Sequence, residues 1–206
     1  MTEKHIFIES KENKIEALLE DLPGENCVIV THPHPLYGGD MNNHVVESVC
    51  AAYRERGFST LRFNFRGVGE SDGVYDNGIG EQEDVSAAIN FMEGLGKKNI
   101  HLAGYSFGAW VNYLGIEKYD SVRKMVMVSP PVGFLDFSCN IPDPKIKLVI
   151  TGSNDDVADP EKIKKIVYQW NPKAIFKIIK GTDHFYMVSN REIKDIIFEF
   201  LEKELP

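Results

Sequence analysis

Apolar runs of about strand length recur along most of the chain. Two short segments, 5–10 and 14–20, precede the first proline and predict an antiparallel hairpin. Further apolar runs predict strands over 27–32, 59–65, 99–105, 124–130, 147–152 and 174–181. Because these later runs are nearly continuous in Val, Ile and Leu, they are typical of parallel strands that are covered on both faces.

Segments of helical length separate most of these strands. They cover 42–57, 80–96, 107–116, 160–170 and 190–205. Strands that alternate with helices predict a right-handed, doubly wound α/β sheet. The connection over 129–146 is different, because it is rich in proline and has no helical period, so we expect a compact loop rather than a cap domain. The chain has no linker and no internal repeat, and residues 1–206 are expected to form a single domain.

The most informative residue follows the run over 99–105. Ligands of open parallel sheets bind outside the carboxyl ends of the strands, and Ser106 lies just there, between Gly104 and Gly108. The sequence GYSFG is the G-x-S-x-G pattern of a nucleophile elbow, a tight turn that leaves no space for side chains at the glycines and strains the serine. The alternative is that three small residues merely form a turn.

A serine hydroxyl becomes a nucleophile when a neighbouring base takes its proton. In this fold the acid and then the histidine follow later strands. Asp155 and Asp156 come directly after the run over 147–152, and His184 comes directly after the run over 174–181. This conjunction predicts a catalytic triad with Ser106, although His184 could instead be a buried structural histidine.

Four stretches carry a resemblance to a known family: HPHPLYGGDMNNHVV, LRFNFRGVGESDG, GYSFG and GTDHF. The chain resembles the α/β-hydrolase superfamily, and more narrowly its small, capless bacterial members, which are loosely akin to dienelactone hydrolases. The resemblance covers nearly the whole chain and implies a three-layer fold, with a mostly parallel sheet of about eight strands, an antiparallel N-terminal hairpin and no cap domain. It implies a triad but no particular substrate. The usual G-x-x-D pattern of the superfamily matches residues 152–155 and favours Asp155 over Asp156.

Two nearby aspartates have simpler interpretations. Asp183 is adjacent to His184, and neighbours in sequence rarely present their side chains to each other, so we expect it to anchor a local turn. Asp159 precedes Pro160, a position that favours capping of a helix.

Acyl transfer also requires backbone donors that face the developing oxyanion. The first is expected to be the amide of Phe107, directly after the serine. The second usually comes from the loop after the third strand, here THPHPLYGG, in which Pro33 and Pro35 have no N–H. His34 or Leu36 is left, and the position after the strand favours His34.

Two alternative hypotheses, a metal site and a phosphate-binding loop, concern the loops beside Ser106. His32, His34, Asp40 and His44 could be ligands of a metal ion, but no H-E-x-x-H or comparable spacing supports such a site. The glycine-rich segment FRGVGESDG could be a phosphate-binding loop, but it lacks the G-K-[ST] ending and has Asp72 in place of the last glycine of G-x-G-x-x-G.

The same glycine-rich segment contains an arginine that we interpret as structural. The superfamily commonly has D-x-R-G-x-G-x-S at this point, and Arg66 is expected to tie loops together near the site. This chain has Asn64 in place of the aspartate, so no role of that acidic residue can be carried over.

Composition and charge exclude several partners. The formal net charge of −8 argues against nucleic acid and against an anionic membrane, since both require a basic face. No apolar run approaches a membrane span, and the N-terminus lacks the apolar core of a signal peptide, so a cytoplasmic protein is expected. Cys27, Cys50 and Cys139 are odd in number and widely spaced, which argues against a disulfide framework or a CxxC metal site.

The sequence thus predicts a serine hydrolase that acts on a small-molecule acyl substrate without cofactor or metal. A small carboxylic ester, thioester or lactone is favoured by family analogy, although C–C hydrolysis and perhydrolysis use the same triad. The alternative is a non-catalytic ligand- or partner-binding protein that retains the scaffold. The pocket is expected to be lined by Tyr37, Tyr105, Phe134 and Tyr186, with Met41 and Phe137 as further candidates. The oligomeric state is not indicated.

Overall fold

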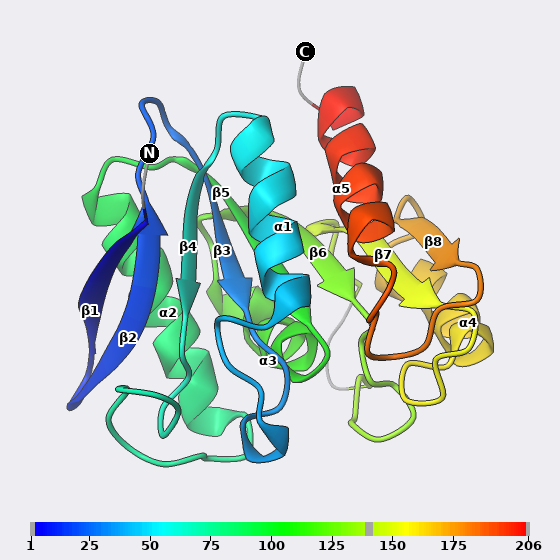
Figure 1. Ribbon diagram of the computed structural model, residues 1–206, viewed down its shortest axis with the longest axis horizontal. Coiled ribbons are helices and arrows are strands. Elements are labelled where there is room, and N and C mark those ends of the chain that lie inside the picture. The colour runs from blue at the N-terminus through cyan, green and yellow to red at the C-terminus, as the bar shows by residue number, and fades with distance from the viewer. Residues whose placement is uncertain (1–2, 139–141, 205–206) are drawn as a thin grey trace.

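A computed structural model of the chain describes residues 3–138 and 142–204, in which eight strands form one sheet (Figure 1). The strands are β1 (Lys4–Ser10), β2 (Asn13–Glu20), β3 (Asn26–Thr31), β4 (Ser59–Phe63), β5 (Asn99–Tyr105), β6 (Val122–Val128), β7 (Ile146–Gly152) and β8 (Ile175–Ile179). Their order across the sheet is β1-β2-β4-β3-β5-β6-β7-β8. The pair β1–β2 is the predicted antiparallel hairpin, β2–β4 is antiparallel as well, and all the other pairs are parallel, which confirms the mostly parallel sheet.

Helices cover both faces of this sheet. They are α1 (His44–Glu55), α2 (Ile79–Gly94), α3 (Phe107–Gly115), α4 (Pro160–Trp170) and α5 (Asn190–Glu204). Helices α1 and α5 pack on one face, and α2, α3 and α4 pack on the other, which gives three layers (Figure 1). Asp159 caps α4 by accepting hydrogen bonds from the first turn, as expected. Among the described helices, none has the length and apolar character needed to cross a membrane.

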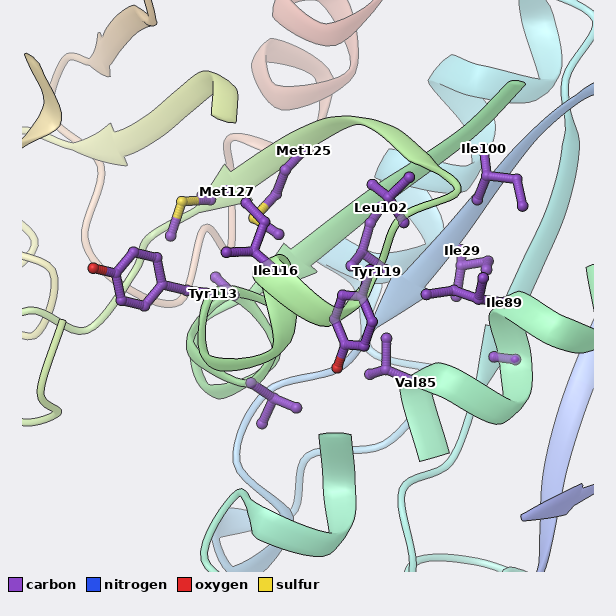
Figure 2. Close-up of a cluster of buried hydrophobic side chains, with 14 of the residues drawn as sticks. Ile29, Val85, Ile89, Ile100, Leu102, Tyr113, Ile116, Tyr119, Met125 and Met127 are labelled. Carbon is purple, nitrogen blue, oxygen red and sulfur yellow. The ribbon is translucent and has the colours of Figure 1, made fainter. Parts of the chain in front are cut away.

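Strand β3 illustrates why the central strands are apolar throughout. Cys27 and Ile29 face the core beneath α2 and α3, whereas Val28 and Val30 face the core beneath α1 and α5. Figure 2 shows the first of these cores, in which Ile29 lies close to Val85 and Ile89 of α2 and to Ile100 of β5. Burial of each such side chain stabilises the fold by about 1.5–3 kcal/mol, so both faces of the strand contribute.

The connection between β6 and β7 is a loop, as predicted. Its described parts, 129–138 and 142–145, contain neither helix nor strand. The expectation of no cap domain is confirmed by the overall architecture. Cys27 and Cys50 are buried free thiols, and burial raises the pKa of each to about 12, so they behave as apolar side chains; Cys139 lies outside the described residues.

Candidate active site

Loops from four consecutive strands meet at one edge of the sheet. Strands β5, β6, β7 and β8 are neighbours and run parallel, so their carboxyl ends lie side by side. Ser106 follows β5, Ser129 follows β6, Asp155 lies in the loop after β7, and His184 lies in the loop after β8. The topology therefore brings together polar residues that are up to 78 positions apart in the sequence.

Ser106 occupies the strained turn that its neighbours predict. Its φ is 53° and its ψ is −117°, in a region that residues other than glycine rarely adopt. Its N–H donates to the carbonyl of Val128 at 2.9 Å, which fixes the turn against β6. A Cβ at Gly104 would lie 2.6 Å from a backbone nitrogen of α3, and a Cβ at Gly108 would lie 2.6 Å from the carbonyl oxygen of Thr31. Close packing of backbone therefore requires both glycines.

His184 lies between Ser106 and Asp155. Its Nε2 is 2.9 Å from Ser106 Oγ, and its Nδ1 is 3.0 Å from both carboxylate oxygens of Asp155. All three residues are nearly buried, with exposed fractions of 7%, 8% and 2% for Ser106, His184 and Asp155. Because a carboxylate only accepts hydrogen bonds, Nδ1 carries a proton and Nε2 is free to accept the Ser106 hydroxyl hydrogen.

The loop that carries His184 is held on both sides. The Tyr105 hydroxyl donates to the carbonyl of His184 at 2.7 Å, and His44 Nε2 donates to the carbonyl of Phe185 at 2.8 Å. Asp183 Oδ1 accepts the N–H of Phe185 and thereby closes the local turn that the sequence analysis assigned to it. These contacts fix the backbone on which the imidazole stands.

The carboxylate of Asp155 is surrounded by donors. Oδ1 accepts the N–H groups of Val157 at 3.0 Å and Ala158 at 2.6 Å, and Oδ2 accepts the hydroxyl of Ser129 at 2.6 Å. Burial alone would raise the pKa of Asp155, but the hydrogen bonds from His184, Ser129 and Ala158 outweigh it, and the pKa lies below its usual value. The group is therefore ionised at neutral pH. The alternative acid, Asp156, is exposed.

The loop after β3 leaves one amide unused. Leu36 N–H donates to His34 Nδ1, Tyr37 N–H and Gly39 N–H both donate to the His34 carbonyl, and Gly38 N–H donates to a proline carbonyl. Between residues 33 and 39 of the described chain, the amide of His34 alone has no acceptor. The amide of Phe107 begins α3 and likewise has no acceptor within the helix. The alternative donor, Leu36, is thus already used.

Neither ring of the two loop histidines fits a metal site. His32 is fully buried, with Nδ1 donating to the carbonyl of Pro33 at 2.6 Å and Nε2 accepting the N–H of Phe65 at 3.0 Å. Burial lowers the pKa of His32 to about 4, so the ring is neutral and both nitrogens are used. His34 Nδ1 accepts a backbone N–H, and its Nε2 is 3.3 Å from the hydroxyl of Tyr75.

Another cluster of potential metal ligands among the described residues joins strands β1 and β2 to the loop after β4. The ligand atoms of His5, Glu16 and Glu70 lie within 4.8 Å of one another. However, the Glu16 carboxylate already accepts hydrogen bonds from the His5 ring, the Asn64 amide and the N–H of Glu70. These donors account for its charge without an ion.

A cavity of about 520 Å³ opens beside Ser106 and His184. Its lining comes from the loops after β3, β5, β6, β7 and β8: Pro33, His34, Tyr37, Gly38, Gly39, Asn43, Tyr105, Ser106, Phe107, Pro131, Phe134, Leu135, Val157, His184 and Phe185. Among the described residues of this lining there is no Asp, Glu, Lys or Arg. Two larger hollows, between α1 and α5 and between β1 and α2, contain none of the three hydrogen-bonded residues Ser106, His184 and Asp155.

The structure brings three of the four aromatic residues expected to line the pocket to this cavity. Tyr37, Tyr105 and Phe134 line the cavity. Tyr186 does not, and this placement corrects the sequence interpretation: the side chain is fully buried and its hydroxyl lies 2.6 Å from Ser129 Oγ. Burial alternates from residue 182 to residue 186, so that Tyr186 turns inward like His184. Met41 and Phe137 are buried as well and do not line the cavity.

Sequence reasoning missed other residues of the site. Leu135, Val157 and Phe185 line the cavity, and Ser129 touches Asp155. The position of Phe185 directly after His184 was a usable signal, whereas nothing local in the sequence marks Ser129.

Arg66 joins loops near the site, as interpreted. Its guanidinium pairs with the Asp84 carboxylate through Nη2 at 2.9 Å and Nε at 3.1 Å. The backbone N–H of Arg66 donates to the same carboxylate. Asp84 also accepts the hydroxyl of Ser10, so the arginine links the β4–α2 loop to α2 and β1. Asn64 joins a different pair, because it accepts the N–H of Met41 at 2.8 Å and donates to Glu16.

Comparisons with known proteins agree with this architecture. The family model described as "Alpha/beta hydrolase family" matches residues 28–147. An uncharacterized protein of Rickettsia prowazekii (strain Madrid E) is 34% identical over 208 residues, which cover 95% of this chain and 87% of that protein. An alpha-beta serine hydrolase homologue from Coxiella burnetii is similar in structure, with a TM-score of 0.90, 34% identity and coverage of 98% of both chains. An a/b serine hydrolase without lid from Xanthomonas campestris has a TM-score of 0.90 and 28% identity, covering 100% of this chain and 96% of the other.

Proposed function

Since the chain belongs to the alpha/beta hydrolase family, we propose that it is a serine hydrolase that cleaves a small carboxylic ester, thioester or lactone through an acyl-enzyme. The observation that carries the proposal is the continuous hydrogen-bond chain from Ser106 through His184 to Asp155. Nucleophile, base and orienting acid stand within hydrogen-bond distance of one another, which is the geometry that this chemistry needs.

In the proposed reaction, Ser106 Oγ attacks the substrate carbonyl while His184 Nε2 takes the hydroxyl proton. Asp155 holds the imidazole in the tautomer with Nδ1 protonated and stabilises the imidazolium that forms. His184 then returns the proton to the leaving group, which departs and leaves the acyl group on Ser106. Water, deprotonated by the same nitrogen, attacks the acyl-enzyme, the bond between the acyl carbon and Ser106 Oγ breaks, and His184 returns the proton to Oγ as the acid is released.

The oxyanion is proposed to accept hydrogen bonds from the amides of Phe107 and His34. Support comes from the hydrogen-bond pattern, since both amides lack an acceptor and the other amides between 33 and 39 are used or absent. Preorganised donors of this kind are worth about 3 kcal/mol each in the transition state. Aromatic contacts fix the loop, because the His34 ring lies 4.7 Å from the Phe107 ring, measured between centroids.

The cavity supports a preference among substrates. Its described lining is mostly apolar, with Asn43, Ser106 and two histidines as the polar side chains, and it includes no carboxylate, ammonium or guanidinium group. Burial of an unpaired charge is costly, so an uncharged acyl group is favoured over one that carries a carboxylate. A volume of about 520 Å³ suits a small molecule rather than a folded partner.

A fluorophosphonate probe tests the proposal at the level of one residue. Purified protein is labelled, and the adduct is located by peptide mass spectrometry. Labelling is expected at Ser106 and is expected to vanish in Ser106→Ala, while Ser138→Ala, which removes an exposed serine hydroxyl from the loop after β6, labels like the wild type. Absence of labelling in well-folded protein would contradict an activated serine and favour a binding role.

A further inference from the structure

Ser129 lies beside Asp155, and the proposed reaction assigns it no role. It directly follows β6, the strand that lies between β5, which ends before Ser106, and β7, which ends before Asp155. Its side chain is completely buried. The carboxylate of Asp155 is 2.6 Å from one side of its hydroxyl oxygen, and the hydroxyl of Tyr186 is 2.6 Å from the other.

The direction of these two hydrogen bonds follows from counting protons. Ionised Asp155 has no proton to give, so the Ser129 hydroxyl must donate to Oδ2. A serine hydroxyl has one hydrogen, which leaves Ser129 only as an acceptor toward Tyr186. The Tyr186 hydroxyl is therefore the donor, and burial raises the pKa of this phenol, which keeps its proton in place at neutral pH. The result is a one-way hydrogen-bond relay from Tyr186 through Ser129 to Asp155.

Ser129 and Tyr186 both adopt unfavourable backbone conformations where their hydroxyls meet. The φ of Ser129 is 45° and that of Tyr186 is 55°, and both lie in the left-handed region that favours glycine. Ser129 N–H donates to the carbonyl of Ile150 at 2.7 Å, which fixes the turn against β7. Strain of this kind persists only where the surrounding structure enforces it, and it concentrates at functional sites.

The relay acts on one particular oxygen. Asp155 Oδ1 is held by two backbone amides of its own loop, whereas Oδ2 accepts the Ser129 hydroxyl and lies only at the long distance of 3.4 Å from Thr151 Oγ1. His184 Nδ1 is 3.0 Å from both oxygens. Loss of the Ser129 hydroxyl would leave Oδ2 with His184 as its one close donor.

We propose that the Tyr186–Ser129 relay positions the Asp155 carboxylate and partly neutralises it, and thereby sets the basicity of His184. The inference rests on the proposed function, since it assigns two positioning residues to that reaction. Without the donor, more negative charge stays on the oxygen that faces Nδ1, which stabilises the imidazolium. The ring then loses its proton at higher pH, and the pH range in which Nε2 can accept the Ser106 proton narrows from the acid side.

Few charged groups besides Asp155 lie near the hydroxyls that hold the His184 loop. The titratable groups that interact with the Tyr186 and Tyr105 hydroxyls are Asp155 and Asp183, together with the two phenols themselves. Both phenols have a pKa raised by burial and stay neutral, and Asp183 is exposed. Removal of the Ser129 hydroxyl therefore acts directly on Asp155 and Tyr186, whereas Asp183 and Tyr105 keep their own hydrogen bonds to Phe185 N–H and to the His184 carbonyl.

The experiment compares Ser129→Ala, Tyr186→Phe and the double variant with the wild type. Ser129→Gly removes the same hydroxyl and relieves the positive φ, so it serves if Ser129→Ala fails to fold. Tyr119→Phe is the matched control, because it removes another buried tyrosine hydroxyl, one that bonds to Gln82. The readouts are the rate of fluorophosphonate labelling from pH 5 to pH 9 and the proton NMR resonance of His184 Nδ1–H over the same range.

We expect the variants at positions 129 and 186 to label up to about threefold more slowly at pH 6, as the acid limb moves upward by about half a pH unit. Since Tyr186 acts only through Ser129, the double variant is expected to match the Ser129 variant. An unmoved acid limb, or additive effects in the double variant, would overturn the relay. If even the wild type fails to label, the proposed function fails, and the His184 resonance alone decides: an upward shift of its titration in the variants supports the relay, and an unchanged titration rejects it.

Discussion

The side-chain amide of Asn64 donates to Glu16 Oε2 across 2.7 Å, where the end of β4 lies beside β2. The same amide group accepts the N–H of Met41 through its oxygen, so one side chain links the hairpin to the loop after β3. An aspartate, common at this position in the superfamily that the sequence resembles, could accept from Met41 but could not donate to Glu16. Asn64 therefore provides the hydrogen-bond donor that the Glu16 carboxylate in β2 requires.

Asn64→Asp is expected to destabilise the fold by about 2–4 kcal/mol at pH 8, because it buries two carboxylates in contact. In the wild type, burial would raise the pKa of Glu16, but the Glu70 N–H, His5 and Asn64 together lower it, so its stabilising contribution is present above its unfolded pKa and is lost as the pH falls through the folded value. In the variant, repulsion raises the pKa of one carboxyl, so the stability deficit grows as the pH rises above about 4.

Urea unfolding of the variant from pH 4 to pH 8 measures this dependence. Asn99→Asp is the matched control, since the Asn99 amide donates to Asn26 rather than to a carboxylate. Glu16→Gln in the Asn64→Asp background is expected to restore most of the lost stability at pH 8. A deficit that does not vary with pH would show that repulsion between the carboxylates is not its cause.

Asp155→Asn is expected to lower the turnover of a labile ester by about 10³–10⁴-fold. The Asn oxygen would take the amide donors of Val157 and Ala158, which turns its NH₂ group toward His184. The ring must then carry its proton on Nε2, where it cannot accept the hydrogen of Ser106. Asp156→Asn changes the adjacent, exposed carboxylate and should retain nearly full activity. Comparable losses in the two variants would contradict the role proposed for Asp155.

Glycine 108 provides a test of the elbow itself. A Cβ at Gly108 would lie 2.6 Å from the backbone oxygen of Thr31, so Gly108→Ala must push α3 away from β3. We expect a loss of stability of about 2–4 kcal/mol and slower labelling of Ser106, because the turn shifts with the helix. Gly94→Ala, at the end of α2, meets no atom within 4 Å and is expected to be neutral or slightly stabilising in thermal unfolding. Equal effects of the two substitutions would refute the crowding argument.

The sequence predicted those parts of the fold and site that depend on local signals. Apolar runs located every strand, because both faces of the central strands are buried, as β3 shows. Ser106 and the two glycines were recognisable because the tight turn itself dictates small residues at fixed spacing. Asp155 and His184 were recognisable because each lies in the loop that follows a strand, in a known chain order.

The residues that were missed depend on long-range geometry instead. Ser129 stands in an unremarkable SPP segment, and it meets Asp155 only because β6 and β7 are neighbours in the sheet. Tyr186 was assigned to the pocket because it is an aromatic residue close to His184, but the alternation of the loop directs it inward. The pairing of Asn64 with Glu16 joins β4 to β2 across 48 positions and has no signature in either segment.

The cavity beside Ser106 is expected to select substrates by the charge of their acyl group. Because the described lining of the cavity contains no Asp, Glu, Lys or Arg, a neutral butyryl ester is expected to be hydrolysed more efficiently than a succinyl ester, which carries a free carboxylate. Phe134 is 73% exposed at this cavity, so Phe134→Lys can be accommodated without loss of core packing and adds a cation there. We expect this variant to shift the ratio of kcat/KM values toward the succinyl ester by about fivefold, as for a favourable pair of about 1 kcal/mol near a protein surface. Tyr168→Lys adds the same charge at an exposed aromatic position on α4, outside the lining, and should leave the ratio unchanged. A shift of equal size in both variants would mean that overall charge, rather than the cavity, selects the acyl group.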